Sequence, residues 1–205
     1  MFERYLAEHG IAVPEHEPDL GIRVRPEYVV EVQGKCCLCE VKEFAESTNS
    51  LPGTGPWGGK IRHKPIRTQV HHGARKLREA RDLGMPLVVV LTNPRGAPVL
   101  LDDVDDVIPA LHGDLVLTLD PYQEAILDTG LNGELTEHHA YLTGVVVLHE
   151  HLLPRDGKSV HASAFLPRSP SAIALPACFF RGPHDRVYEF FEDRRSYMCV
   201  HPASA

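Results

Sequence analysis

The sequence lacks a hydrophobic run long enough to cross a lipid bilayer. Its longest purely aliphatic run is residues 87–91, whereas a membrane-spanning helix needs about 20 predominantly apolar residues. The first ten residues mix charged with apolar side chains and contain no hydrophobic stretch typical of a secretory signal. We therefore expect a cytoplasmic protein without a transmembrane segment.

A disulfide framework is also missing. The chain of 205 residues has five cysteines, an odd number, and three of them lie within residues 36–39. This distribution is typical of free thiols in a reducing compartment. With 43% hydrophobic residues, the chain can bury a core without disulfides or a structural metal. It shows no internal repeat and no clear linker.

Three familiar site motifs are absent. The cysteine cluster has no second pair to complete a zinc knuckle, so core packing of Cys37 and Cys39 is the better interpretation. Residues 54–61 lack the first glycine and the final Ser or Thr of a Walker A loop. His149 and His151 do not have HExxH spacing. A histidine-based zinc hydrolase remains a remote alternative, and it predicts zinc bound through this histidine pair.

The first half of the chain has the clearer signals of secondary structure. Two β-rich runs, residues 26–32 and 36–42, flank a turn that contains Gly34 and predict a hairpin. Apolar spacing predicts helices over residues 2–9 and 66–83, each followed by a glycine. Other ranges are assigned from composition: an edge strand at 11–17, a long functional or disordered loop at 44–65 with four Gly and three Pro, and a buried strand at 86–92.

The order of strand, crossover helix and buried strand predicts parallel pairing. Beyond residue 96 we expect a helix at 104–111, strands at 115–119 and 142–149, and a Pro-rich tail that wraps the core from residue 154. The resulting hypothesis is an α/β protein with a core at residues 1–96. Residues 97–205 are expected to form an elaboration packed on that core within one structural domain.

The hairpin brings charged groups together. Glu40 and Lys42 are two residues apart, so a strand directs both side chains to the same face. A two-residue turn at either Gln33 and Gly34 or Gly34 and Lys35 places Glu27 on that face as well, whereas a three-residue loop without a bulge would reverse it. Two carboxylates suit Mg²⁺, which takes oxygen ligands and keeps several waters. The lysine could stabilise hydroxide or the developing negative charge on a phosphate.

These residues resemble a known motif. Pro26-Glu27, thirteen residues before Glu40-Val41-Lys42, is similar to the PD-(D/E)xK motif of the restriction-endonuclease-like phosphodiesterases. The predicted order of elements over residues 2–92 also resembles the αβββαβ core of that family. The resemblance implies such a core, with a mixed sheet and a C-terminal α/β extension.

The resemblance also implies roles for individual residues. Glu27, Glu40 and the carbonyl of Val41 would bind Mg²⁺ or Mn²⁺, and Lys42 would be the catalytic lysine. The family has further polar groups near the metal and the scissile phosphate, and the matching positions here are Glu3 for the metal and Gln69, with His72 or Lys76, for the phosphate.

The first acid departs from the family pattern. Glu27 stands where Asp is usual. Pro18-Asp19, which matches the Pro-Asp of the motif in residue type, lies upstream, so Asp19 is a rival metal ligand. We favour Glu27 because it opens the strand that pairs with the Glu40 strand, whereas Asp19 precedes Gly21 in a predicted loop.

Charge is unevenly distributed along the chain. The formal net charge is -7, which alone argues against a nucleic-acid partner. Residues 60–81, however, have eight Lys or Arg and one acid, whereas residues 102–128 have eight acids and no Lys or Arg. The basic segment follows the candidate site and could steer phosphate. Its expected nucleic-acid contacts are Lys60, Arg62, Lys64, Arg67, His72 and Lys76.

The sequence therefore predicts a metal-dependent nuclease that hydrolyses phosphodiester bonds, with DNA as the expected nucleic acid. The alternative is a non-catalytic nucleic-acid-binding or interaction protein that retains the fold while its acidic site has drifted.

Overall fold

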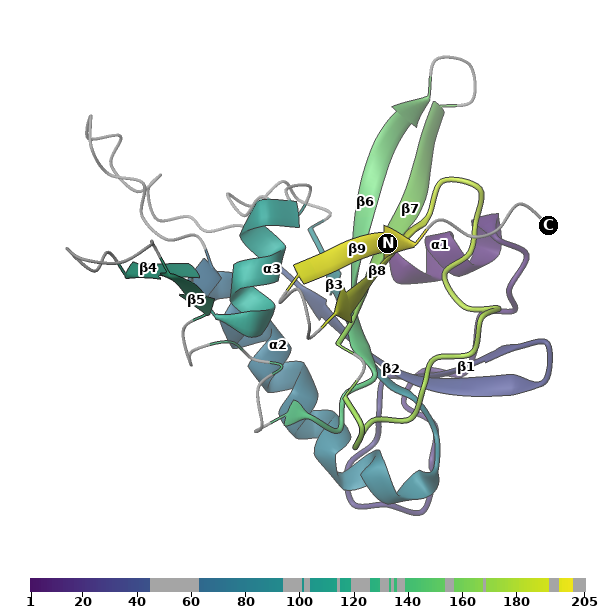
Figure 1. Cartoon of the computed structure of the whole chain (residues 1–205). Helices are drawn as coiled ribbons and strands as arrows, with labels where there is room; N and C mark the ends of the chain where they lie inside the picture. Colours follow the sequence, from purple (N-terminus) through teal and green to yellow (C-terminus); the bar gives the residue numbers. More distant parts are fainter. Residues whose placement is uncertain are drawn as a thin grey trace.

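A mixed sheet with helices on both faces forms the centre of the molecule (Figure 1). The computed structural model describes residues 1–44, 63–93, 101, 104–113, 115–118, 126–129, 133, 135, 139–153, 157–167, 169–191 and 196–200. The seven strands of the sheet run in the order β1-β2-β3-β6-β7-β8-β9, and β4 pairs with β5 in a separate two-stranded sheet. The predicted α/β class with a mixed sheet is confirmed.

The elements of the described part of the chain include helices up to residue 112, and all later elements are strands. They are α1 (Phe2–Glu8), β1 (Tyr28–Val32), β2 (Lys35–Glu43), α2 (His63–Leu77), the 3-10 helix η1 (Arg78–Leu83), β3 (Leu87–Thr92), α3 (Val104–His112), β4 (Leu115–Thr118), β5 (Ile126–Thr129), β6 (Gly144–Leu153), β7 (Gly157–Leu166), β8 (Arg186–Phe191) and β9 (Ser196–Val200).

The β1–β2 hairpin forms as expected. Val32 pairs with Lys35, which leaves a two-residue turn. Gln33 and Gly34 in this turn have φ angles of 53° and 73°. Positive φ at both positions is the requirement of a type I′ turn, whose twist matches that of the strands. The pairing of Tyr28 with Cys39 continues toward Glu27 and Glu40, so the structure has one of the two registers that the sequence left open.

The crossover from β2 to β3 is also confirmed. The two strands are parallel, with Leu38 beside Leu87, and α2 followed by η1 connects them. Gly84, with φ 70°, ends η1 in the left-handed conformation, which favours glycine. All six residues of β3 are buried, as its continuous apolar sequence requires.

Two predictions about the strands are wrong. Residues 11–17 do not form an edge strand, and His16 makes only an isolated antiparallel bridge to Tyr28. Pro14 and Pro18 lack the N–H that a ladder needs, and Glu17 has a φ of 52°. The segment after residue 154 does not merely wrap the core, because β7, β8 and β9 extend the same sheet.

The other predicted elements are present with shifted ends. The expected helix at 104–111 is α3, and the strands expected at 115–119 and 142–149 are β4 and β6. Within the predicted loop at 44–65, residues 45–62 lie outside the described residues, and residues 63–65 belong to α2.

The two faces of the sheet have separate hydrophobic cores. On the α2 face, Val89 and Val147 pack with α2 and α3. On the α1 face, Val88 and Val146 pack with apolar side chains of α1. Strand β2 follows the same alternation: Leu38 joins the core of the α2 face, and Cys37 and Cys39 join that of the α1 face. The prediction that these cysteines are core residues is confirmed.

None of the helices in the described part of the chain is both long enough and apolar enough to span a membrane.

We expect the stability of the protein to depend on pH because of the imidazole of His112. His112 stacks on Phe190, with ring centroids 4.3 Å apart, and burial lowers the pKa of His112 to about 4. In the unfolded chain its pKa is about 6.5, so between these two values the unfolded state binds the extra proton. Stability is therefore lost as the pH falls from 6.5 to 4, by up to about 3 kcal/mol. Urea unfolding at pH 7 and pH 4.5 measures this loss. The His112→Gln variant should lose less, and equal losses would contradict the assignment.

Candidate active site

Glu40 is a fully buried carboxylate on the α2 face of β2, with 0% of the residue exposed. Its Oε1 accepts a hydrogen bond of 2.7 Å from Lys42 Nζ and lies 3.1 Å from Lys76 Nζ. Its Oε2 accepts a 3.2 Å bond from the backbone N–H of Glu27. A buried charge is costly unless it is paired and hydrogen-bonded, and here both oxygens have partners.

Glu27 lies opposite Glu40, and its own carboxylate accepts a hydrogen bond from β2. Glu27 Oε2 accepts a 3.1 Å bond from the backbone N–H of Val41, and Oε1 lies 3.7 Å from His16 Nε2. Burial, followed by the negative charge of Glu40, raises the pKa of Glu27. Each carboxylate is thus held by a backbone amide of the other strand, which fixes both at one edge of the hairpin.

The carbonyl of Val41 faces the same side as Glu27. In an extended strand, the N–H and C=O of one residue point to the same neighbouring strand. The N–H of Val41 is directed at the Glu27 carboxylate, so its carbonyl is directed to that side as well. Three oxygen-bearing groups therefore lie along the edge where β1 begins.

Two lysines reach the same carboxylate oxygen from different elements. Lys42 comes from β2 and Lys76 from α2, and their side chains are 23% and 28% exposed. Lys76 also lies 3.7 Å from Glu17 Oε1. Three carboxylates and two ammonium groups give the cluster a net charge of about -1 when His16 is neutral.

A glycine allows α2 to lie close to the sheet at this point. A Cβ on Gly73 would be 2.9 Å from both γ carbons of Val89, which is the residue paired with Glu40 in the β2–β3 ladder. Gly73 precedes Lys76 by three residues, or about one helical turn. The close approach at Gly73 therefore helps to bring Lys76 to Glu40.

Gly73→Ala is expected to lower the free energy of unfolding by about 1–3 kcal/mol, because overpacking outweighs the better helix propensity of alanine. Denaturant unfolding measures the change. The double variant Gly73→Ala with Val89→Ala supplies the control, since it removes the γ carbons that collide. The interpretation is wrong if Gly73→Ala is as stable as the parent, or if the Gly73 substitution costs as much in the Val89→Ala background.

Two predicted acidic ligands lie elsewhere. Glu3 Oε1 accepts a 2.8 Å bond from the hydroxyl of Tyr28, whose side chain packs in the core of the α1 face. Asp19 pairs with Arg25 at 3.2 Å, and its side chain is 67% exposed. Glu27, rather than Asp19 or Glu3, is the acid that the structure brings to Glu40.

The described residues predicted to contact nucleic acid or the scissile phosphate all lie on α2, but their surroundings differ. Lys64 and His72 are exposed on α2, and Gln69 on the same helix is half-buried. Arg67 donates a 3.1 Å bond to the carbonyl of Pro109 in α3, and Lys76 contacts Glu40. Lys60 and Arg62 lie outside the described residues.

The sequence did not indicate that His16 and Glu17 lie at the candidate site. The bridge between His16 and Tyr28 lays this segment beside the start of β1, and the backbone N–H of Glu17 donates a 2.8 Å bond to the carbonyl of Glu27. Nothing in the local sequence indicates this contact, because it depends on how the chain returns after α1.

The described residues contain no group of three or more His, Cys, Asp or Glu side chains placed to hold a metal ion. The candidate site offers two carboxylates and a backbone carbonyl instead. His149, from the alternative zinc hypothesis, has its Nε2 3.1 Å from Ser163 Oγ, and the side chain of His151 lies outside the described residues.

Comparisons with protein-family models, with curated proteins and with solved structures gave no match. The geometry of the site is therefore the basis for inferring its function.

Proposed function

We propose that this chain is a metal-dependent phosphodiesterase that hydrolyses nucleic acid, with DNA as its substrate, on a restriction-endonuclease-like core. The observation that carries the proposal is the reciprocal pair formed by Glu27 and Glu40, with Lys42 bonded to the buried carboxylate. This arrangement supports the resemblance to the PD-(D/E)xK motif, because it unites the acids and the lysine of that motif at one edge of the hairpin.

The available donors suit a hard cation. Glu27, Glu40 and the carbonyl of Val41 supply oxygen atoms only, and Mg²⁺ prefers oxygen ligands while waters complete its coordination. Burial, followed by the negative charge of Glu40, raises the pKa of Glu27, and a cation bound between the two carboxylates would offset the repulsion between their like charges. Bound there, Mg²⁺ or Mn²⁺ would polarise the phosphodiester and lower the pKa of a coordinated water.

Lys42 would act directly at the phosphate. Its ammonium group is held at 2.7 Å by Glu40, and its side chain remains 23% exposed. A positioned cation of this kind stabilises the negative charge that develops as water attacks phosphorus. Gln69 and the exposed Lys64 and His72 on α2 would contact the neighbouring phosphates of the substrate.

One observation favours a second candidate, a non-catalytic binding or interaction protein. Glu40 is completely buried, and its oxygens already bond to two lysines and one amide. Lys76 thus supplies positive charge where a catalytic cation would sit. In this alternative the acids and lysines stabilise the β2–α2 contact and have no catalytic role.

A metal-titrated cleavage assay separates the two candidates. Plasmid DNA, linear DNA and RNA are incubated with Mg²⁺, Mn²⁺ or a chelator, and metal binding is measured in parallel by calorimetry. The nuclease proposal expects metal-dependent cleavage that Glu27→Gln abolishes. Asp19→Asn is the matched control, because it removes one charge from the rival acid and should leave cleavage unchanged.

Two results would overturn the nuclease proposal. One is the failure of both metals to bind or to support cleavage of any of the three substrates. The other is equal cleavage by the parent and by Glu27→Gln, which would assign the activity to another site or to a contaminant.

A further inference from the structure

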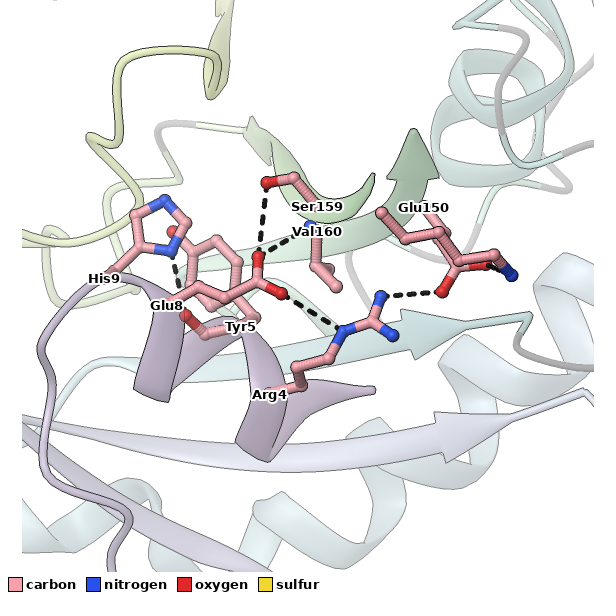
Figure 2. Close-up of polar contacts among 8 residues, drawn as sticks. Arg4, Tyr5, Glu8, His9, Glu150, Ser159 and Val160 are labelled. Carbon is pink, nitrogen blue, oxygen red and sulfur yellow. Dashed lines mark hydrogen bonds and ion pairs between the residues drawn. The ribbon is translucent and has the colours of Figure 1, made fainter. Parts of the chain in front are cut away.

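A second candidate site lies on the α1 side of the sheet, away from Glu40. A cleft of about 470 Å³ is bounded by α1, the β1–β2 turn, the first half of β7 and the segment before β8. Figure 2 shows Glu8 of α1 in contact with Ser159 and Val160 of β7, and His9, which follows α1, in contact with the carbonyl of Tyr5. The first half of β7 pairs only with β6, because β8 pairs with β7 from Ser163 onward, so this edge of the strand is open to α1 and the cleft.

The floor of the cleft is fixed by Asp185, whose side chain is 1% exposed. Its Oδ1 accepts a 2.7 Å bond from the N–H of Ala162. Its Oδ2 accepts bonds of 2.6 Å from the hydroxyl of Tyr5 and 2.7 Å from the N–H of Gly182. These donors satisfy the carboxylate and connect α1, β7 and the loop before β8 at the cleft.

Glu8, on the rim of the cleft, also has hydrogen-bond and ion-pair partners. Glu8 pairs with Arg4 at 3.2 Å and accepts bonds of 2.8 Å from the N–H of Val160 and 3.2 Å from Ser159 Oγ (Figure 2). Glu8 therefore covers an open edge amide of β7 and shares its charge with a guanidinium. The Asp185 carboxylate also lies close to the cleft, with its Oδ2 3.8 Å from His9 Nε2, so an anion would depend on Arg181, the only Lys or Arg among the described residues that line the cleft.

The cleft presents cationic and imidazole groups. Arg181 is half-buried and has no ion-pair partner among the residues that the structure describes. His184 stacks on His161 with ring centroids 4.8 Å apart, and His9 lines the same cleft. No three ligating side chains in the described parts of the chain are placed for a metal, so these groups are better suited to donate hydrogen bonds to an anion.

The residue before Arg181 has an unusual backbone conformation. Phe180 has a φ of 50° and is 4% exposed, and a bulky residue rarely adopts this left-handed region. On the other side, a Cβ on Gly182 would collide with the His9 ring. A strained residue such as Phe180 persists where the surrounding structure fixes it, and such residues cluster at binding sites. Arg181 thus lies between the strained Phe180 and the closely packed Gly182.

We propose that this cleft binds a small phosphorylated molecule of about mononucleotide size. Arg181, His161 and His184 would donate to the phosphate, since a guanidinium group and imidazoles are suited to a multiply charged oxyanion. Ile11 and Val32 supply apolar lining for the rest of the molecule. The volume lies within the range of about 300–1,000 Å³ typical of ligand pockets.

Calorimetry with three probes tests the proposal on the full chain. Inorganic phosphate, adenosine monophosphate and adenosine are titrated separately, and phosphate is then tested as a competitor. We expect adenosine monophosphate to bind, phosphate to compete with it, and adenosine to bind at least tenfold more weakly. Arg181→Gln should weaken adenosine monophosphate binding by at least tenfold. The matched control is Arg186→Gln, which changes an exposed arginine on β8 that does not line the cleft.

Several outcomes would overturn the assignment. They are the absence of binding by both phosphate and adenosine monophosphate, equal affinity for adenosine, and an unchanged affinity in Arg181→Gln. This inference does not depend on the proposed nuclease function. Glu27→Gln should keep adenosine monophosphate binding, and Arg181→Gln should keep any metal-dependent cleavage, so failure of one proposal is distinguishable from failure of the other.

Discussion

Asp185→Ala is expected to lower the free energy of unfolding by about 3–5 kcal/mol, because it leaves buried donors on three segments without an acceptor. The donors are the amides of Ala162 and Gly182 and the hydroxyl of Tyr5. Burial, followed by the charge of Asp185, raises the pKa of Tyr5, so Tyr5 remains a neutral donor in this contact. At about 2–4 °C per kcal/mol for a chain of this size, the melting temperature should fall by roughly 10 °C.

Urea unfolding and thermal melting measure the effect, with two further variants for comparison. Tyr5→Phe removes one donor and keeps the ring, so it should cost less than Asp185→Ala. Asp82→Ala removes an acid whose side chain is 86% exposed, and it should change stability by about 0.5 kcal/mol or less. A loss below 1 kcal/mol for Asp185→Ala would show that Asp185 does not hold α1, β7 and the loop together.

The hairpin could be predicted because its signals are local. Two β-rich runs flank Gly34, and only a few turn lengths are compatible with a short connection. The sequence left two registers open, and the structure selects the one in which Val32 pairs with Lys35. The placement of Glu27 opposite Glu40 follows from that register and from the period of two in a strand.

The remaining contacts of the site are not local, and the sequence did not reveal them. Lys76 was expected on a basic nucleic-acid surface, yet the close approach of α2 at Gly73 places it against Glu40. His16 and Glu17 reach the site through an isolated bridge rather than a strand. Such placements depend on how distant segments pack, which neither periodicity nor composition specifies.

The C-terminal strands were missed for a different reason. β7 contains Gly157, Lys158, two alanines and two serines, which are weak or neutral β formers. Tertiary packing overrides this low propensity, because Val160, Ala162 and Ala164 fill the core beneath α1. β8 has a stronger signal, with Val187, Tyr188 and two phenylalanines within six residues, and that run could have indicated a strand.

Lys42→Ala is expected to slow metal-dependent cleavage by roughly 10²–10³-fold, the usual cost of removing one positioned donor to a developing negative charge. Lys76→Ala should have a smaller effect on the rate. Both lysines contact Glu40 Oε1, but Lys42 is the nearer one, at 2.7 Å against 3.1 Å, and Lys76 is shared with Glu17. The expected difference between the two variants therefore tests whether Lys42 acts on the substrate or only neutralises Glu40.

The cleavage rate at saturating metal and DNA is the appropriate measurement, together with the unfolding free energy of each variant. Lys35→Ala, which removes an exposed lysine at the other end of β2, is the matched control and should retain the full rate. Lys42→Arg should not restore it, because a planar guanidinium differs in shape and reach from an ammonium group. If Lys42→Ala and Lys76→Ala lose stability equally and both keep the parental rate, the lysines serve only as counter-ions of a buried carboxylate. The fold would then be retained without the chemistry of the motif.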